Sequence, residues 1–193
     1  MTAVPDKPRT RENFDVLEHL PEIAQIGEES LRESVVQIWH ELWDASSWEC
    51  VRDVAVGPDI AQPHLPHNRA IIKLALSVAD IWEEVHGVTV NRDLLIAAAA
   101  LQDASKLVEY SPIGGGRVEM SELGSNFPHA FWVAHVALNH GLSHELCEIL
   151  INHTPQSAKF PRTLIGKILY YVDQLDVIAI HRDRWRKELF ITK

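Results

Sequence analysis

The sequence has few cysteines, few basic residues and no long apolar run, and each absence excludes a class of protein. Cys50 and Cys147 are its two cysteines and form no C-x-x-C pair, which excludes a thiolate zinc site and predicts a reducing compartment. Lys and Arg number 18 against 27 acidic residues, a net charge of −9, so no nucleic-acid partner is expected. No apolar run reaches the ~18 residues of a membrane span. Residues 1–13 lack the apolar core of a signal peptide. We therefore expect a cytoplasmic protein with no membrane partner.

The chain has the composition of a single globular domain. Its 193 residues are 46% hydrophobic and 23% charged, which predicts a folded domain rather than a disordered chain. Residues 1–13 are charged and contain prolines, so we expect a flexible N-terminal tail followed by one domain over residues 14–193. Eleven histidines are many for this length and favour a metal site.

Apolar residues recur at helical spacing through most of the domain. Asn91 and Ser143 are suitable N-caps, and Gly87 is a suitable helix end. Residues 94–101 are apolar on every side, which is typical of the buried central helix of a bundle. No convincing strand pair is present, although residues 113–120 could form a small hairpin around three glycines. We predict an all-α bundle with about six main helices, over residues 28–43, 66–85, 91–110, 128–140, 143–153 and from about 161 past 176 to 190.

The first of these helices has an apolar face from Leu31 to Leu42 that includes Trp39, with Trp43 beside it. Such a face fits either the protein core or a self-association surface. Both a monomer and a homo-oligomer are therefore compatible with the sequence.

Five histidines and aspartates lie on apolar helix faces, where a buried polar group without a partner costs ~1–3 kcal/mol. A single residue of this kind is commonly a helix cap or a satisfied core polar group. Together, however, they offer one imidazole or carboxylate from each of five helices. One divalent metal, or two metals bridged by a carboxylate, would satisfy all of them. The five are His67, Asp103, His129, His153 and Asp173.

The order of these residues resembles that of the HD-domain superfamily. The segment Leu101 to Tyr110 reads LQDASKLVEY, where family members carry His-Asp-x-x-Lys-Leu. Residues 65–69 (LPHNR) resemble the helix of the first histidine. The segment from His129 to His153 resembles the paired-histidine segment of two-metal members, and residues 171–176 (YVDQLD) resemble the final aspartate motif. The resemblance spans about residues 64–180.

The resemblance implies a helical bundle that holds one or two divalent metal ions, such as iron or manganese. Asp103 would bridge the two metals and orient the nucleophile. Lys106 would meet an anionic group of the substrate, although a lysine late in a helix can equally be a solvated residue favoured by the helix dipole. Arg117 and Ser121 could also reach the substrate. The first metal would be held by His67, Gln102, Asp103 and Asp173, and the second by Asp103, His129 and His153.

Gln102 departs from the family pattern, because it stands where the signature histidine is expected. Glutamine offers a neutral amide oxygen, a weaker ligand than imidazole for zinc or iron. Three interpretations follow: Gln102 binds a harder metal through oxygen, the first metal is weak or absent, or the glutamine is an engineered substitution.

Metal-assisted hydrolysis of a phosphate ester on a small anionic molecule is the leading interpretation, with Asp103 and Lys106 as the catalytic residues. A di-iron oxygenase similar to the myo-inositol and phosphonate oxygenases of the same superfamily is the alternative within enzymes. A non-catalytic binding module is the third interpretation, and it depends on Gln102 alone.

Overall fold

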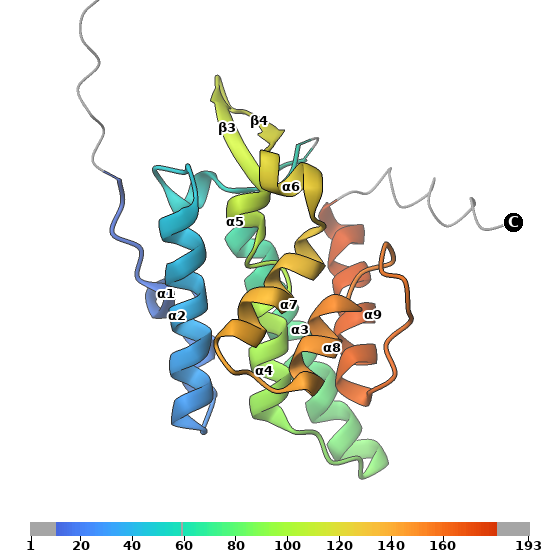
Figure 1. Cartoon of the computed structure of the whole chain (residues 1–193). Helices are drawn as coiled ribbons and strands as arrows, with labels where there is room; N and C mark the ends of the chain where they lie inside the picture. Colours follow the sequence, from blue (N-terminus) through green and yellow to red (C-terminus); the bar gives the residue numbers. More distant parts are fainter. Residues whose placement is uncertain (1–10, 59, 181–193) are drawn as a thin grey trace, which may run out of the picture.

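The computed structural model describes residues 11–58 and 60–180, and they form an all-α bundle (Figure 1). This confirms the predicted fold class. The expected number of main helices is also confirmed within the described residues, where six helices have eight or more residues. They are α2 (Glu29–Ala45), α3 (His64–His86), α4 (Arg92–Leu101), α7 (His129–Asn139), α8 (His144–Ile151) and α9 (Leu164–Ile180).

Shorter elements connect and flank these helices. They are the helices α1 (Val16–His19), α5 (Lys106–Glu109) and α6 (Glu122–Asn126), and the 3-10 turns η1 (Pro21–Gln25) and η2 (Val51–Asp53). None of the helices within the described ranges has the length and apolarity needed to cross a membrane.

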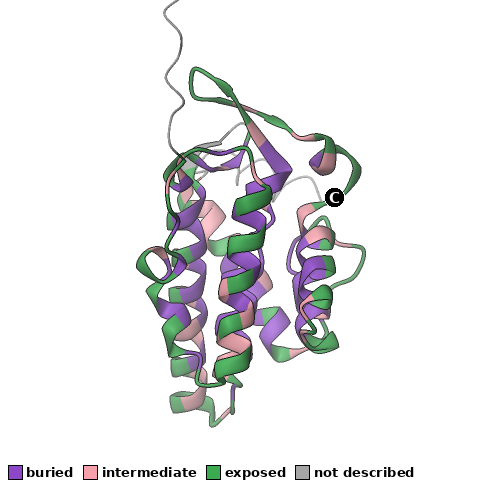
Figure 2. Ribbon diagram, turned by 60° about the vertical axis from the view of Figure 1, so that its left-hand side comes forward, coloured by how far each residue is buried: buried purple, intermediate pink, exposed green. Residues whose placement is uncertain are grey.

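Helix α4 occupies the centre of the bundle, as its sequence predicts. Every residue from Leu94 to Leu101 is buried. The helix contacts α2, α3, α8, α9 and η1, so it has neighbours on all sides. Figure 2 shows the buried residues gathered on the inward faces of the surrounding helices. The apolar character of α4 on every side therefore follows from its position between the other helices.

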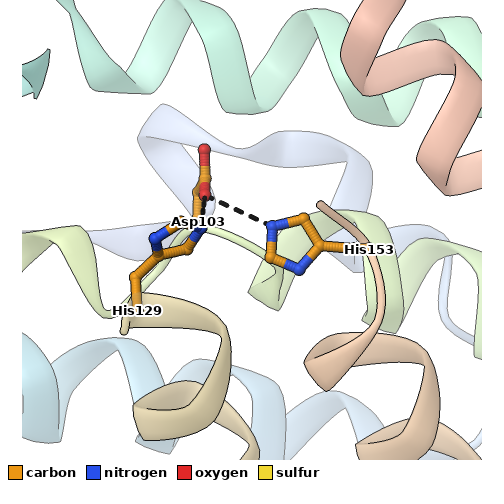
Figure 3. Close-up of side chains that lie close together, drawn as sticks. All are labelled: Asp103, His129 and His153. Atoms are coloured by element: carbon orange, nitrogen blue, oxygen red, sulfur yellow. Dashed lines mark ion pairs between the residues drawn. The ribbon is translucent and has the colours of Figure 1, made fainter. Parts of the chain in front are cut away.

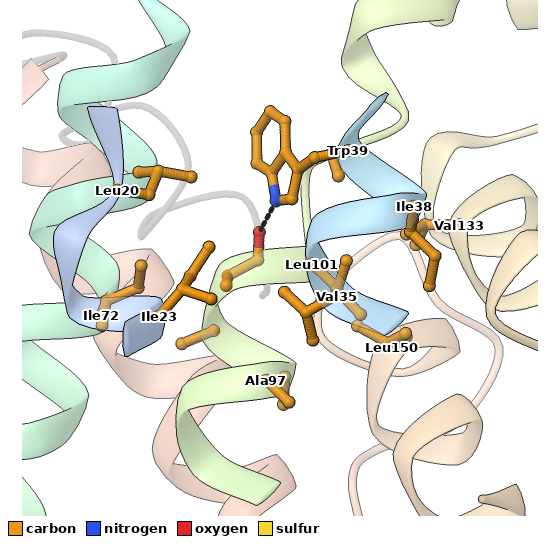
Figure 4. Close-up of a cluster of buried hydrophobic side chains, with 14 of the residues drawn as sticks. Leu20, Ile23, Val35, Ile38, Trp39, Ile72, Ala97, Leu101, Val133 and Leu150 are labelled. Atoms are coloured by element: carbon orange, nitrogen blue, oxygen red, sulfur yellow. Dashed lines mark hydrogen bonds between the residues drawn. The ribbon is translucent and has the colours of Figure 1, made fainter. Parts of the chain in front are cut away.

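The apolar face of α2 belongs to the core rather than to a self-association surface. Val35, Ile38, Trp39, Leu42 and Trp43 are all buried within the single chain. The indole Nε1 of Trp39 donates a hydrogen bond of 3.1 Å to the backbone carbonyl oxygen of Ala100, near the end of α4 (Figure 4). This bond satisfies the polar atom that burial of the Trp39 ring takes away from water.

Three predicted helix ends are confirmed. The side chain of Asn91 accepts a hydrogen bond of 3.1 Å from the Leu94 amide, and Ser143 caps α8 in the same way. Gly87 ends α3 with a φ of 65°, a left-handed conformation that glycine adopts without a steric penalty.

The helix predicted over residues 91–110 is broken, which corrects the sequence-based expectation. Helix α4 ends at Leu101, and residues 102–105 form a tight turn before α5 begins at Lys106. Within the turn the Ala104 amide bonds the Leu101 carbonyl at 2.9 Å, and the Lys106 amide bonds the Asp103 carbonyl at 3.0 Å. These i to i+3 bonds are tighter than α-helical ones and redirect the chain after Leu101.

Two small antiparallel hairpins are present, so the expectation of no convincing strand pair was wrong. The first pairs β1 (Ala55–Gly57) with β2 (Ile60–Pro63). The second pairs β3 (Tyr110–Gly114) with β4 (Arg117–Met120) and projects from one end of the bundle (Figure 1). This second hairpin is the one expected from the three glycines. Gly114, Gly115 and Gly116 all have positive φ, which lets the chain reverse between the two strands.

Residues 11–13 contact the domain, although the sequence assigns them to the flexible tail. The Glu12 amide donates to the Glu49 carbonyl at 2.9 Å, and the Arg11 guanidinium lies 4.3 Å from the centre of the Trp43 ring. Residues 1–10 of the predicted tail, and the predicted extension of the last helix to residue 190, lie outside the described residues.

Candidate metal centre

The five histidines and aspartates singled out from the sequence converge on one place in the bundle. Their nitrogen and oxygen atoms form two groups, and within each group the atoms lie within 4.8 Å of one another. One group is His67 of α3, Asp103 of the turn after α4, and Asp173 of α9. The other is Asp103 again, His129 at the start of α7, and His153 just after α8. Asp103 belongs to both groups.

The two oxygens of the Asp103 carboxylate face different partners. Oδ1 lies 3.4 Å from Nε2 of His129 and 3.6 Å from Nε2 of His153 (Figure 3). Oδ2 lies 3.2 Å from Nε2 of His67 and 3.0 Å from Nζ of Lys106. A carboxylate that presents one oxygen to each of two ligand groups has the arrangement of a bridging ligand.

Asp173 completes the group around His67. Its Oδ1 lies 3.4 Å from Nε2 of His67, so the same ring nitrogen faces the carboxylates of both Asp103 and Asp173. The amide of Gln174 donates a hydrogen bond of 3.0 Å to the other oxygen of Asp173. This bond holds the carboxylate in place on α9.

The turn after α4 and the start of α7 are tied together beside the site. The hydroxyl of Ser105 donates a hydrogen bond of 2.8 Å to the backbone carbonyl of His129. Pro128 precedes His129 and has a φ of −59°, which suits the entry to a helix. The contact therefore places the first residue of α7 against the turn that carries Asp103.

Burial and charge shift the pKa values of the site in opposite directions. Burial alone would raise the pKa of Asp103, but the Lys106 ammonium and the three histidines hold it well below its usual range. Burial would lower the pKa of Lys106, and the nearby Asp103 carboxylate more than offsets this and raises it. Asp103 is thus an ionised acceptor, and Lys106 is a charged ammonium beside it.

His67 is surrounded by carboxylates. Burial lowers the pKa of its imidazole, but hydrogen bonds to Asp103, Asp173 and Asp176 raise it well above the usual value. The surrounding carboxylates therefore favour the protonated ring when only protein atoms surround it. Deprotonated carboxylates and imidazoles in a buried site are the donor set that divalent transition metals accept, so these residues fit such an ion.

Each histidine of the site has an acceptor behind its second ring nitrogen. Nδ1 of His67 lies 2.7 Å from Oδ2 of Asp176, and Nδ1 of His129 lies 3.5 Å from Oε1 of Glu109. Nδ1 of His153 lies 2.6 Å from the Leu150 carbonyl. Neither Asp176, which lies in the final aspartate motif, nor Glu109 was assigned a role from the sequence. Helical spacing could have found both, because they follow Asp173 and Lys106 by three residues, which is about one turn.

Gln102 is fully buried, and its amide has no hydrogen-bond partner among the described residues. Buried amides without partners are rare in native proteins. A metal ion bound by the Gln102 oxygen would give this amide a partner. Its assignment as a metal ligand stays a prediction.

The side chains of His64 and Asn68 on α3 are also fully buried without hydrogen-bond partners in the described part of the chain. Burial lowers the pKa of His64 to about 3, so its ring is neutral.

The three residues predicted to bind substrate occupy different surroundings. Lys106 is in the site, as described above. Ser121 caps α6: its hydroxyl accepts from the Gly124 amide at 3.0 Å and donates to the Val108 carbonyl at 2.6 Å. Arg117 is exposed at the tip of the β3–β4 hairpin. Substrate binding by all three stays a prediction.

Comparison with known proteins gives one informative similarity. No family model matches the chain, and no solved structure matches it significantly. The chain is 30% identical over 113 residues to a dihydroneopterin 2′,3′-cyclic phosphate phosphodiesterase of Methanocaldococcus jannaschii. The matching segment covers 58% of this chain and 45% of that relative, so the chain corresponds to less than half of the relative's length.

Proposed function

We propose that this protein is a metal-dependent hydrolase of the HD-domain type that cleaves a phosphate ester of a small anionic molecule. The observation that carries the proposal is Asp103, whose two oxygens face two separate groups of metal-ligating side chains. The similarity to a phosphodiesterase supports phosphate ester hydrolysis as the reaction. Because that relative acts on a cyclic phosphate, a 2′,3′-cyclic phosphodiester is the first substrate to test.

One or two divalent ions would complete the centre. His67, Asp103 and Asp173, with Gln102, would hold the first ion, and Asp103, His129 and His153 the second. Iron and manganese are the first candidates for these ligands. Ions bound here would lower the pKa of a coordinated water and neutralise charge on the phosphate.

The residues of the chain would bind and orient the substrate. The Lys106 side chain is only 11% exposed and its ammonium is charged, so it is suited to attract a phosphate oxygen in a site with little water to screen it. Asp103 is ionised, so its oxygens can accept a hydrogen bond from the attacking water and orient it. Arg117 and Ser121 are secondary candidates for substrate contacts.

Two alternative functions can be distinguished from this proposal by experiment. A di-iron oxygenase would use the same ligands but would consume dioxygen and would not hydrolyse a phosphate ester. A non-catalytic binding module is favoured by one observation, the neutral amide of Gln102 in place of an imidazole. The cytoplasmic location and the oligomeric state stay predictions.

The test uses the full chain, loaded in turn with Mn²⁺, Fe²⁺, Mg²⁺ and Zn²⁺. We expect metal-dependent hydrolysis of bis(p-nitrophenyl) phosphate or of a 2′,3′-cyclic nucleotide, together with bound metal measured by mass spectrometry. Lys106→Ala should impair turnover while metal content is unchanged, because Lys106 contacts Asp103 but is not one of the proposed ligands. Asp80→Asn, at an exposed ion pair with Arg92, is the matched control.

Three results would contradict the proposal. Dioxygen consumption by the iron-loaded protein without phosphate ester cleavage would indicate the oxygenase. The absence of bound metal and of turnover, even in Gln102→His, would indicate a binding module. Unchanged kinetics in Lys106→Ala would remove Lys106 from the substrate site.

A further inference from the structure

The three histidines of the centre are oriented in the same way. In each ring Nε2 points at the Asp103 carboxylate, at 3.2 Å for His67, 3.4 Å for His129 and 3.6 Å for His153. In each ring Nδ1 points away from Asp103, toward an acceptor outside the two ligand groups. A ring held through Nδ1–H has its Nε2 free to bind a metal.

The acceptors differ in charge and in distance. The carboxylate of Asp176 lies 2.7 Å from Nδ1 of His67, which is a short hydrogen bond to an ionised group. His153 has a neutral acceptor, the Leu150 carbonyl at 2.6 Å, which no side-chain substitution removes. Glu109 lies 3.5 Å from Nδ1 of His129, at the distance of a loose ion pair. Asp176 is therefore the strongest acceptor that a substitution can test.

Helix α9 supports His67 from two sides. Asp173 and Asp176 are three residues apart and so lie on the same face of the helix. Asp173 faces Nε2 of His67 at 3.4 Å, and Asp176 faces Nδ1 of the same ring at 2.7 Å. Both nitrogens of a ring that is almost completely buried are thus held by carboxylates from one helix.

We propose that Asp176 is a positioning residue that holds the Nδ1–H of His67 and so commits Nε2 to the metal of the group formed by His67, Asp103 and Asp173. The inference rests on the proposed function, because it assumes that this group binds a metal. A carboxylate behind the ring also makes the imidazole a stronger ligand. This support matters most in the group where Gln102 replaces an expected imidazole.

Metal affinity tests the inference directly. Metal-free full-length protein is titrated with Mn²⁺ by calorimetry, in the unaltered form and as Asp176→Ala and Asp176→Asn. We expect two binding events in the unaltered protein, and in Asp176→Ala a loss of about 10- to 100-fold in the affinity of one of them. Asp176→Asn keeps an oxygen that can accept from Nδ1–H, so its loss should be smaller.

A matched control removes a histidine partner at an exposed site. Glu41 lies 2.6 Å from Nε2 of His140, a separation close to that of Asp176 and His67. Glu41→Ala should leave both Mn²⁺ affinities unchanged. Circular dichroism of each metal-free variant establishes that the helices are intact.

Nitrogen-15 NMR of the Zn²⁺-loaded protein gives a readout that a purely structural contact would not produce. In the unaltered protein the His67 ring should carry its proton on Nδ1, with Nε2 deprotonated and shifted by the metal. In Asp176→Ala we expect the Nδ1–H signal to weaken or disappear through exchange with water, and in Asp176→Asn we expect it to persist.

Different results would contradict the role of Asp176 and the proposed function. Equal Mn²⁺ affinities in the unaltered protein and in Asp176→Ala, with the His67 Nδ1–H retained, would overturn the role of Asp176 and leave the proposed function standing. If Asp176→Ala does not fold, the Mn²⁺ affinity of Asp176→Asn decides instead. An affinity that is either unchanged or fully lost in Asp176→Asn would also overturn the role of Asp176. Failure of the unaltered protein to bind any of the four metals would overturn the proposed function itself.

Discussion

The two ligand groups that share Asp103 differ in charge and in access to solvent. Around His67, two carboxylates face one ring nitrogen and a third carboxylate faces the other. The second group has one carboxylate and two rings. The His129 side chain is 18% exposed, whereas the His67 side chain is 1% exposed. Asp103 is thus shared by a carboxylate-rich group and an imidazole-rich group, and His129 of the second group is the most exposed of the five residues.

This difference suggests a division of roles within the proposed centre. The carboxylate-rich group would hold its cation mainly through charge, which suits harder metals, and the imidazole-rich group would suit softer ones. The open side at His129 is where a small substrate would approach. The predictions below test this division, beginning with the change that removes both groups.

Asp103→Ala should have the largest effect, because it removes the ligand that both groups share. We expect bound metal to fall to background and hydrolysis to be lost. The Lys106 ammonium would lose its partner at 3.0 Å, and because the lysine side chain is 11% exposed the cost should lie below the ~3–5 kcal/mol of a fully buried ion pair. Metal analysis and thermal melts followed by circular dichroism measure the two effects. Unchanged metal content with intact helices would show that the ligand assignment is wrong.

Asp173→Ala and His153→Ala form a matched pair that should divide the centre. Each removes a ligand from one group only, so each protein should bind one equivalent of metal instead of two. The remaining event should be the softer-metal site in Asp173→Ala and the harder-metal site in His153→Ala. Calorimetric titrations with Zn²⁺ and Mn²⁺ compare them. Identical metal preferences in the two variants would refute the division of roles.

Gln102→His should strengthen the first group, because an imidazole replaces a neutral amide. We expect tighter binding of Zn²⁺ or Fe²⁺ in one of the two events, with the other event unchanged. Gln102→Leu is the companion variant and should weaken the same event if the amide oxygen is a ligand. If neither substitution alters metal binding, Gln102 is not a ligand.

A comparison that does not involve bound metal concerns His64 and His67, which lie one turn apart on α3 and have pKa shifts of opposite sign. Burial lowers the pKa of His64 from 6.5 to about 3 in the folded state. Between these values the unfolded chain binds a proton that the folded chain does not. The stability contributed by His64 is therefore complete above pH 6.5 and is lost toward pH 3, by up to about 1.4 kcal/mol per pH unit.

His67 has the opposite behaviour. Its raised pKa contributes stability that is present below pH 6.5 and is lost as the pH rises through the folded value. Carboxylates with a lowered pKa, such as Asp103, also lose stability toward low pH, but they are common to the unaltered protein and to His64→Phe. Denaturation of both metal-free proteins between pH 4 and 6.5 therefore isolates His64 by difference. We expect His64→Phe to flatten the acid loss of stability relative to the unaltered protein, and parallel pH profiles would refute the assignment.

The sequence was most informative where a residue's type conflicts with its surroundings. His67, Asp103, His129, His153 and Asp173 stood out because each is polar on an apolar helix face, and the structure brings all five together. The roles of Asp176 and Glu109 escaped notice for a physical reason. Acidic residues within a helix are ordinary until a neighbouring ring nitrogen gives them a role.

The local geometry around the site was less predictable. The polar residues 102, 103, 105 and 106 follow the apolar run of α4, but none of residues 102–105 is a glycine or a proline that would mark a turn. That turn nevertheless brings Asp103 between α3 and α7. Likewise, the β1–β2 hairpin has too few residues to produce an alternating pattern.

The sequence by itself determined the all-α class, the central position of α4 and the identities of the inward-facing imidazoles and carboxylates. These depend on hydrophobic periodicity and on the cost of burying a polar group, which are properties of short segments. Only the tertiary structure decided which oxygen of Asp103 faces which histidine, and which acceptor stands behind each ring. Those choices depend on distances between residues as far apart as 67 and 176, which only the packing of α3 against α9 sets.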